Sequence, residues 1–217
     1  MLFLSLPDLI SHAITLIIAI TVHEFSHALA ADRLGDPTPA RDGRLVLNPL
    51  MHLDPLGSIL MLVGGFGWGR PVMVNPFRLR PPIRASMALV AAAGPFSNLI
   101  LALLAAIPIR LGLFQVWDIP AINGITPSLS EFIATFILLN LGLLFFNLIP
   151  ITPLDGSKIA YGVLPEAWAD ALSRLDPYGP MILLVLLISG RFLPFNILGL
   201  LIGPAQLGLY NLIVGTA

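Results

Sequence analysis

The sequence contains no cysteine and very little charge. The lack of cysteine excludes disulfide bonds, thiolate metal sites and thiol catalysis, so any bound metal must be held by His, Asp or Glu. Only 11% of the 217 residues are charged, against about 25% in a typical soluble domain, and 57% are hydrophobic. The net charge of −1, with basic residues too spread to form a groove, argues against a nucleic-acid partner. These features predict an integral membrane protein.

The chain also lacks Ser-rich linkers, low-complexity tracts and internal repeats. We therefore expect residues 1–217 to form a single membrane-embedded domain. The apolar run at residues 9–22 is similar to the core of a signal peptide. No basic residue precedes Arg33, however, and no small-residue cleavage site follows the run. We expect this segment to remain as the first membrane helix.

Five segments are apolar enough to lie in a membrane: Leu9–Ala31, Leu56–Val74, Ala85–Ile109, Leu129–Ile149 and the region from Pro180 onward. As a helix, the first would span roughly 34 Å, which is enough to cross a bilayer. The last region is interrupted by Pro194, and the sequence leaves open whether residues 197–214 cross the membrane. After the fourth segment, Asp155-Gly156-Ser157 indicates the start of a short helix that ends at about Leu164.

The second segment contains five glycines and Pro71, too many helix-breaking residues for a regular membrane helix. We expect a short helix over Ser58–Val63, followed by an extended hairpin or a re-entrant loop. The predicted fold is thus an all-α polytopic membrane protein with about 4–5 membrane helices and a glycine-rich re-entrant loop or β-hairpin after the first. A strand edge within Gly64–Asn75 could capture an unwound substrate segment by β-addition, or the loop could simply plug the interface.

Charge placement predicts the orientation of the chain. Seven of the eleven basic residues lie between Arg33 and Arg84, and one lies between Ala85 and Ser130. By the positive-inside rule, the loop from Arg33 to Arg84 faces the cytoplasm. We expect a multi-pass protein of the cell membrane.

The motif His-Glu-Phe-Ser-His occupies residues 23–27, inside the first apolar segment. Histidines four residues apart on a helix face the same side, about 5–6 Å apart at Cβ, so His23 and His27 can bind one metal ion. Glu24 can then activate a zinc-bound water. The motif lies roughly 12 Å from the cytoplasmic end of its helix, counted from Ala31 at 1.5 Å per residue. The site is therefore expected within the bilayer, nearer the cytoplasmic face.

A catalytic zinc ion usually has three protein ligands, so a third is required. His12 is eleven residues from His23, about 16 Å along the helix axis, which is too far. His52 and Asp54 lie in a loop. Asp155 follows the fourth apolar segment, where two prolines and a glycine hold it at a bend, and it is the leading candidate.

Three stretches together resemble the site-2 proteases, the intramembrane zinc metalloproteases of the M50 class. They are HEFSH at residues 23–27, GPFSN at Gly94–Asn98 and NLIPITPLDG at Asn147–Gly156, in the order typical of the family. The resemblance covers nearly the whole chain. It extends to residues 35–39, 43–44 and 48–57, and it is closest to small prokaryotic members without a PDZ or CBS domain.

The resemblance implies one Zn²⁺ per chain, bound by His23, His27 and Asp155, with Glu24 as the general base. It further implies that Asn98 and Asn147 bind the substrate backbone or the oxyanion. The implied substrates are transmembrane-helix proteins, possibly cleaved first by another protease, while the oligomeric state stays open.

Each functional residue also has a structural interpretation. Asp155 could be a helix N-cap, Asn98 an interhelical hydrogen-bonding residue, and Asn147 a helix C-cap. His52 could be an accessory residue of the site or a solvated loop histidine. Ser97 has no partner histidine on a matching helix, which argues against a serine protease.

The alternative function is a non-catalytic membrane protein that binds or transports divalent metal. Glu24 discriminates between the two functions, because a binding site needs no base beside its ligands. A transporter would also need polar groups on both sides of the site.

Overall fold

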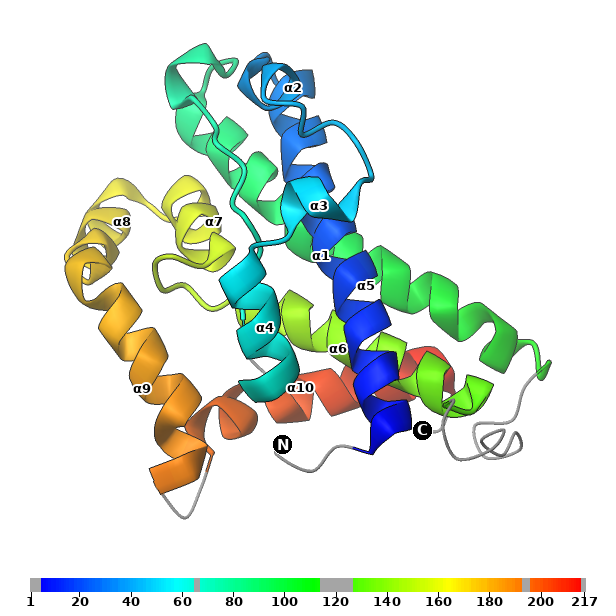
Figure 1. Cartoon of the computed structure of the whole chain (residues 1–217). Helices are drawn as coiled ribbons and strands as arrows, with labels where there is room; N and C mark the ends of the chain where they lie inside the picture. Colours follow the sequence, from blue (N-terminus) through cyan, green and yellow to red (C-terminus); the bar gives the residue numbers. More distant parts are fainter. Residues whose placement is uncertain (1–4, 65–66, 114–126, 193–195, 216–217) are drawn as a thin grey trace.

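The computed structural model describes residues 5–64, 67–113, 127–192 and 196–215. Within these ranges the fold is all-helical, with no strand, as predicted (Figure 1). The helices are α1 (Leu6–Arg33), α2 (Thr38–Arg41), α3 (Pro49–His52), α4 (Pro55–Gly64), η1 (Pro76–Arg78), α5 (Ile83–Arg110), α6 (Leu129–Asn147), α7 (Asp155–Val163), α8 (Glu166–Ser173), η2 (Asp176–Tyr178), α9 (Gly179–Phe192) and α10 (Ile197–Val214).

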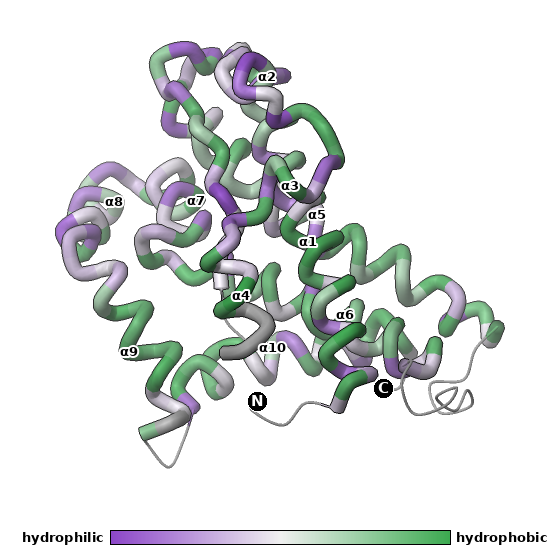
Figure 2. Tube along the Cα trace, in the orientation of Figure 1, coloured by the Kyte–Doolittle hydropathy of each residue, from purple (hydrophilic) through white to green (hydrophobic). Residues whose placement is uncertain are grey.

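Five helical stretches in the described part of the chain are long and apolar enough to cross a membrane. They are Leu6–Arg33, Ile83–Arg110, Leu129–Asn147, Glu166–Gly190 and Ile197–Val214. In the first three, 39–44% of the apolar 18-residue part is buried inside the protein. In the last two, only 6% and 11% of that part is buried. Helices α1, α5 and α6 thus form the core, and α9 and α10 lie at the periphery. Figure 2 shows α9 mostly hydrophobic and α2 and α8 more hydrophilic.

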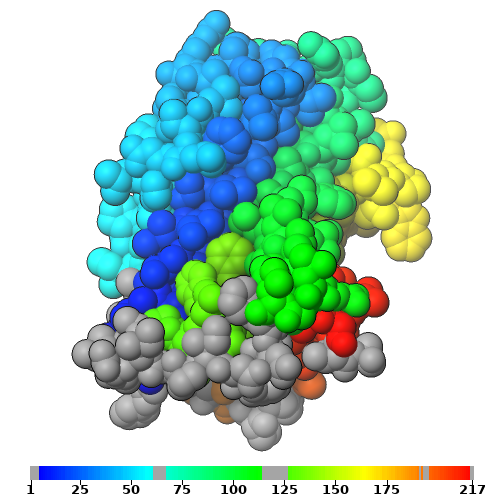
Figure 3. All heavy atoms as spheres, turned by 90° about the vertical axis from the view of Figure 1, so that its right-hand side faces the viewer, coloured from blue at the N-terminus to red at the C-terminus, as the bar shows by residue number. Residues whose placement is uncertain are grey.

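Helix α5 is the centre of the bundle, because it packs against α1, α6 and α7. Figure 3 shows α1 and α5 side by side. Small side chains at Ala102 and Ala106 let α6 and α10 approach α5 closely, with Ile137 and Leu141 fully buried between them. Pro95 lies inside α5, where it removes one helical N–H without ending the helix.

The helix ends follow local sequence signals. Ser5 caps α1 by accepting a hydrogen bond from the Asp8 amide. Ser128 and Glu131 form a reciprocal capping box at the start of α6. Helix α6 ends at Asn147, two residues before the expected end. The Leu148 amide closes its last turn by donating to the Leu144 carbonyl. The sequence did not predict α8.

The glycine-rich segment divides into two parts. Its first part is α4, which is longer than the expected helix over Ser58–Val63. Residues 67–75 then run without regular structure, apart from one antiparallel bridge between Leu53 and Gly69. No hairpin forms within the described residues, and residues 65–66 lie outside them. A re-entrant path for this segment stays a prediction.

Candidate metal centre

Three side-chain atoms from two distant parts of the chain converge at one point. His23 Nε2 lies 3.0 Å from His27 Nε2, and each lies 3.1 Å from Asp155 Oδ2. All three residues are buried. The imidazole rings meet edge to face, with centroids 4.6 Å apart, as expected for histidines one turn apart on α1.

The spacing and the donor atoms suit zinc. In a tetrahedral zinc site with Zn–N distances of about 2.0–2.1 Å, ligand atoms lie about 3.3 Å apart. The three distances here are only slightly shorter, so a small outward shift of the side chains would accommodate the ion. Two imidazoles and a carboxylate form a donor set found in catalytic zinc sites. Among the described residues, no other group of His, Asp and Glu comes together in this way.

Gly94 on α5 supplies the space that a metal ion needs. A Cβ at this position would lie 2.4 Å from His27 Nε2 and 2.6 Å from His23 Nε2, far inside van der Waals contact. Any side chain larger than hydrogen would therefore press on the metal-binding nitrogens. The sequence presents Gly94 as the first residue of the GPFSN stretch, and nothing in that pattern shows that it makes room at the metal centre.

Hydrogen bonds fix both histidine rings with Nε2 toward the centre. His27 Nδ1 donates to the carbonyl oxygen of Val90, at 2.7 Å. His23 Nδ1 lies 2.7 Å from Asn98 Oδ1 and is the donor of that pair, because the Asn98 amide nitrogen donates elsewhere. Protonation at Nδ1 leaves each Nε2 lone pair free for a metal, the arrangement common to metal-binding histidines.

Asn98 belongs to a buried amide network between three helices. It is fully buried, and its Nδ2 donates to Asn140 Oδ1 at 3.0 Å and approaches the Ala19 carbonyl oxygen at 3.4 Å. Asn140 in turn donates to the carbonyl of Phe136. Asn98 does not line the cavity that opens beside the three candidate ligands, so its position favours orientation of His23 over contact with a bound molecule. Asn140 was missed, although a buried asparagine in an apolar helix is itself a signal.

Asp155 is the first residue of α7, and Leu154 occupies the N-cap position. No side chain caps this helix, so the interpretation of Asp155 as an N-cap is wrong. The carboxylate points to the histidines instead. Gly156 lets the start of α7 press on the end of α6, since a Cβ there would lie 2.4 Å from the Ile149 carbonyl oxygen. The expected bend thus places Asp155 beside α1.

A cavity of about 570 Å³ opens beside these three residues. Its walls also include Glu24, Asn147, Lys158 and residues 67–74, apart from Arg70. Asn147 is half-buried and donates to the Leu143 carbonyl at 3.1 Å. Lys158 Nζ lies 3.9 Å from Asp155 Oδ1, the oxygen that faces away from the histidines. Glu24 thus shares one cavity with the candidate ligands without belonging to their cluster.

His52 is not a solvated loop residue. It is fully buried, its Nε2 donates to the Val46 carbonyl at 2.7 Å, and it does not line the cavity. Its own carbonyl oxygen accepts a hydrogen bond from the Arg70 amide at 2.7 Å. An accessory role of His52 at the site stays a prediction.

The chain is similar to several bacterial proteins. It is 42% identical to "Putative zinc metalloprotease YwhC" of Bacillus subtilis over 176 residues, which cover 81% of this chain and 79% of that protein. It is 33% identical to a protein of Mycolicibacterium smegmatis described in the same words and named Rip2, over 80% of this chain and 64% of the relative. Rip2 of Mycobacterium tuberculosis is 32% identical over the same shares.

No protein-family model matches the chain, and no solved structure does. The match to YwhC is nevertheless long and spans most of both proteins. These relatives imply zinc, and the cluster of His23, His27 and Asp155 offers a place to hold it. The chain belongs to the family of zinc metalloproteases represented by these relatives.

Proposed function

We propose that this protein is an intramembrane zinc metalloprotease of the site-2 type, which hydrolyses peptide bonds in the membrane-spanning helices of other proteins. The observation that carries the proposal is the position of the centre. His23 and His27 lie in a helix long and apolar enough to cross a membrane, and Asp155 Oδ2 lies 3.1 Å from both. Ionisable groups at such a depth are expensive unless they have a function.

The chain's own residues can divide the chemistry among them. His23, His27 and Asp155 would hold one Zn²⁺ ion, which when bound polarises the scissile carbonyl and acidifies the attacking water. Glu24, on the wall of the same cavity, takes the proton from that water and passes it to the leaving amine. Asn147, also on the wall, would hydrogen-bond the substrate backbone or the developing oxyanion. Asn98 and the Val90 carbonyl keep the two imidazoles oriented.

The substrate must arrive as an unwound segment, because the peptide bonds of a helix are shielded by the helix itself. Residues 67–74 form one side of the cavity. Because these residues belong to no helix, they could pair with a substrate strand by β-addition, the mode in which main-chain hydrogen bonds give affinity. A transmembrane-helix substrate, trimmed beforehand by another protease, would present such a segment.

We further propose that the protein spans the cell membrane several times, with its centre nearer the cytoplasmic face. The support is the concentration of basic residues between Arg33 and Arg84. Because the native chain has no cysteine, a single Cys introduced at Thr38 reports the orientation directly. Thr38→Cys should be labelled by an impermeant reagent only after the cells are opened. Labelling in intact cells would contradict the orientation.

The test of the proposed activity uses the purified protein in liposomes with a transmembrane-helix substrate. We expect one zinc per chain, cleavage within the substrate's membrane segment, and loss of cleavage on zinc chelation that added zinc restores. Asp155→Ala should lose zinc, whereas His52→Ala should keep it. Zinc retained in Asp155→Ala, but lost in His52→Ala, would contradict the ligand set.

The same liposomes separate the protease from a metal transporter. A transporter would move zinc across the bilayer and leave the substrate intact. Zinc flux without cleavage would contradict the proposed function.

A further inference from the structure

Residues 67–75, which we call the strap, are held tightly where they begin. Trp68 lies against α4, since a Cβ at Gly57 would lie 2.2 Å from the Trp68 carbonyl oxygen. Gly69 lies against α1 and His52, where an added Cβ would be 2.7 Å from Ile20 Cγ2 and 3.3 Å from Glu24 Oε1. The strap therefore passes directly beside the proposed general base.

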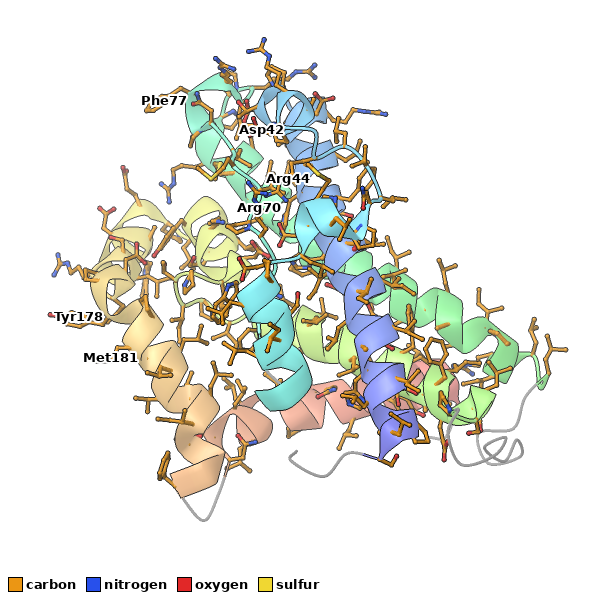
Figure 4. All side chains as sticks on the ribbon, in the orientation of Figure 1. Asp42, Arg44, Arg70, Phe77, Tyr178 and Met181 are labelled. Carbon is orange, nitrogen blue, oxygen red and sulfur yellow. The ribbon has the colours of Figure 1, made fainter. Side chains whose placement is uncertain are left out.

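Arg44 fixes the next two residues of the strap. Its guanidinium Nη1 donates to the carbonyls of Met51 and of Arg70, the latter at 3.2 Å, and its Nη2 donates to the Pro71 carbonyl at 2.9 Å. Figure 4 shows Arg44 and Arg70 next to each other where the strap passes the loop before α3. One side chain thus ties the strap to the loop that covers α1.

The environment of Arg44 indicates a dedicated role. Arg44 is only 6% exposed, and among the described residues its side chain forms no ion pair with a carboxylate. Three carbonyl oxygens accept its hydrogen bonds, and the carboxylates of Glu24 and Asp42 lie near enough to favour its charge. The planar fork of donors makes this geometry possible, and a lysine ammonium cannot reproduce it. A buried arginine is costly unless its donors are satisfied, and here the Met51, Arg70 and Pro71 carbonyls satisfy them.

The far end of the strap has a second attachment. The Asn75 amide donates to Asp36 Oδ2 at 2.6 Å, and Asp36 is fully buried. Between the two attachments, the backbones of Val72, Met73 and Val74 make no hydrogen bond to any described residue. All three residues line the cavity. The strap therefore has main-chain groups available for hydrogen bonding at residues 72–74, on the wall of the cavity that Glu24 also lines.

We propose that Arg44 is a positioning residue that determines which peptide bond is cleaved. It sets the register of the strap relative to Glu24, and a substrate paired with the strap inherits that register. This inference rests on the proposed protease activity and on pairing along the strap. For this to work the strap must keep its place beside Glu24, and the hydrogen bonds from Arg44 to the Arg70 and Pro71 carbonyls hold it there.

The test is the cleavage position, read by mass spectrometry of the products from one transmembrane substrate. We expect the wild-type protein to cut at one predominant bond. Arg44→Lys should cut at several neighbouring bonds, with kcat/KM at the main bond lowered by about tenfold or more, as expected for lost hydrogen bonds to a charged group. Arg41→Lys is the matched control, because Arg41 is exposed and ends α2, three residues before Arg44. It should cut as the wild type does.

Two further variants separate positioning from damage to the fold. Pro71→Gly keeps the carbonyl that Arg44 binds but loosens the strap, so it should scatter the cleavage position without loss of zinc. Glu24→Asp should slow cleavage without moving its position.

Cleavage at the wild-type bond with unchanged kcat/KM in Arg44→Lys would overturn the inference. If Arg44→Lys fails to bind zinc, the decisive variant is Pro71→Gly. Cleavage by Pro71→Gly at the wild-type bond with unchanged kcat/KM then overturns the inference. A wild-type protein that cleaves nothing would instead contradict the proposed function.

Discussion

Gly94 on α5 faces His27 on α1 so closely that a Cβ at position 94 would lie 2.4 Å from His27 Nε2. Backbone approach of this kind is the usual reason for glycine in a packed membrane helix. Here it also leaves room beside the nitrogens that face Asp155. The α1–α5 contact and the metal centre are thus the same piece of structure.

We therefore predict that Gly94→Ala loses zinc and activity together. The methyl group must displace the imidazoles, because the helices on both sides are fixed by their packing. Gly203→Ala is the control, since a Cβ at Gly203 would meet nothing within 4 Å. Zinc content by atomic absorption should fall well below one per chain only for Gly94→Ala. Full zinc occupancy in that variant would contradict the role of Gly94 in making room for the ion.

A second prediction separates the two asparagines of the site. Asn98→Ala removes the acceptor for His23 Nδ1 and leaves the ring free to turn. Loss of such a partner typically weakens metal binding by about 10–100-fold. Asn147→Ala should lower kcat while leaving zinc affinity unchanged, because Asn147 lines the cavity without touching the histidines. Zinc affinities from competition with a chelator, compared with initial cleavage rates, distinguish the two residues. Equal zinc affinity in both variants would contradict the orienting role of Asn98.

A third prediction concerns acid stability through Asp36, which lies outside the membrane-spanning helices. Burial alone would raise the pKa of its carboxyl, but hydrogen bonds from Thr38 and the Asn75 amide, with the charge of Arg78, hold the pKa below its usual value. The ionised form therefore stabilises the fold above the unfolded-state pKa of about 3.9. This stability is lost as the pH falls from about 4 through the lower folded-state pKa.

Asp36→Asn should accordingly lower the melting temperature at pH 7 and flatten its fall below pH 4. Asp42→Asn, at an exposed position just after α2, serves as the control and should keep the wild-type profile. Thermal melts in detergent across this pH range provide the measurement. A wild-type slope below pH 4 in Asp36→Asn would mean that other carboxyls dominate the acid transition.

Much of this architecture follows from local sequence signals. Helix α1 with His23 and His27 could be predicted, because an apolar run and an i, i+4 spacing are both local patterns. The prediction of Asp155 as a metal ligand needed more than a local pattern, since Asp before Gly-Ser is also typical of a helix start. The absence of cysteine, the histidine pair and the bend set by two prolines and a glycine together made it the leading candidate. Its convergence with α1 depends on two tertiary contacts, that of α5 with α1 at Gly94 and that of α7 with the end of α6 at Gly156.

The rest of the site could not be predicted because it depends on backbone atoms and on long-range contacts. The Val90 carbonyl, which fixes His27, belongs to a residue with an ordinary apolar side chain. The hydrogen bonds of Arg44 to the strap join it to Arg70 and Pro71, which lie 26 and 27 positions further along the chain. Neither has a periodic signature, since each depends on where a carbonyl oxygen ends up after folding.

The central claim is most directly tested by the paired measurement of zinc content and substrate cleavage in Glu24→Gln. Glutamine preserves the shape of the side chain but cannot accept a proton from the attacking water. General base catalysis is typically worth about 10²–10⁴-fold, so cleavage of a transmembrane substrate should fall below detection in a gel assay. Zinc should stay at one per chain, because the proposed ligands are other residues, whereas His23→Ala should lose both. Near wild-type cleavage by Glu24→Gln would contradict the account.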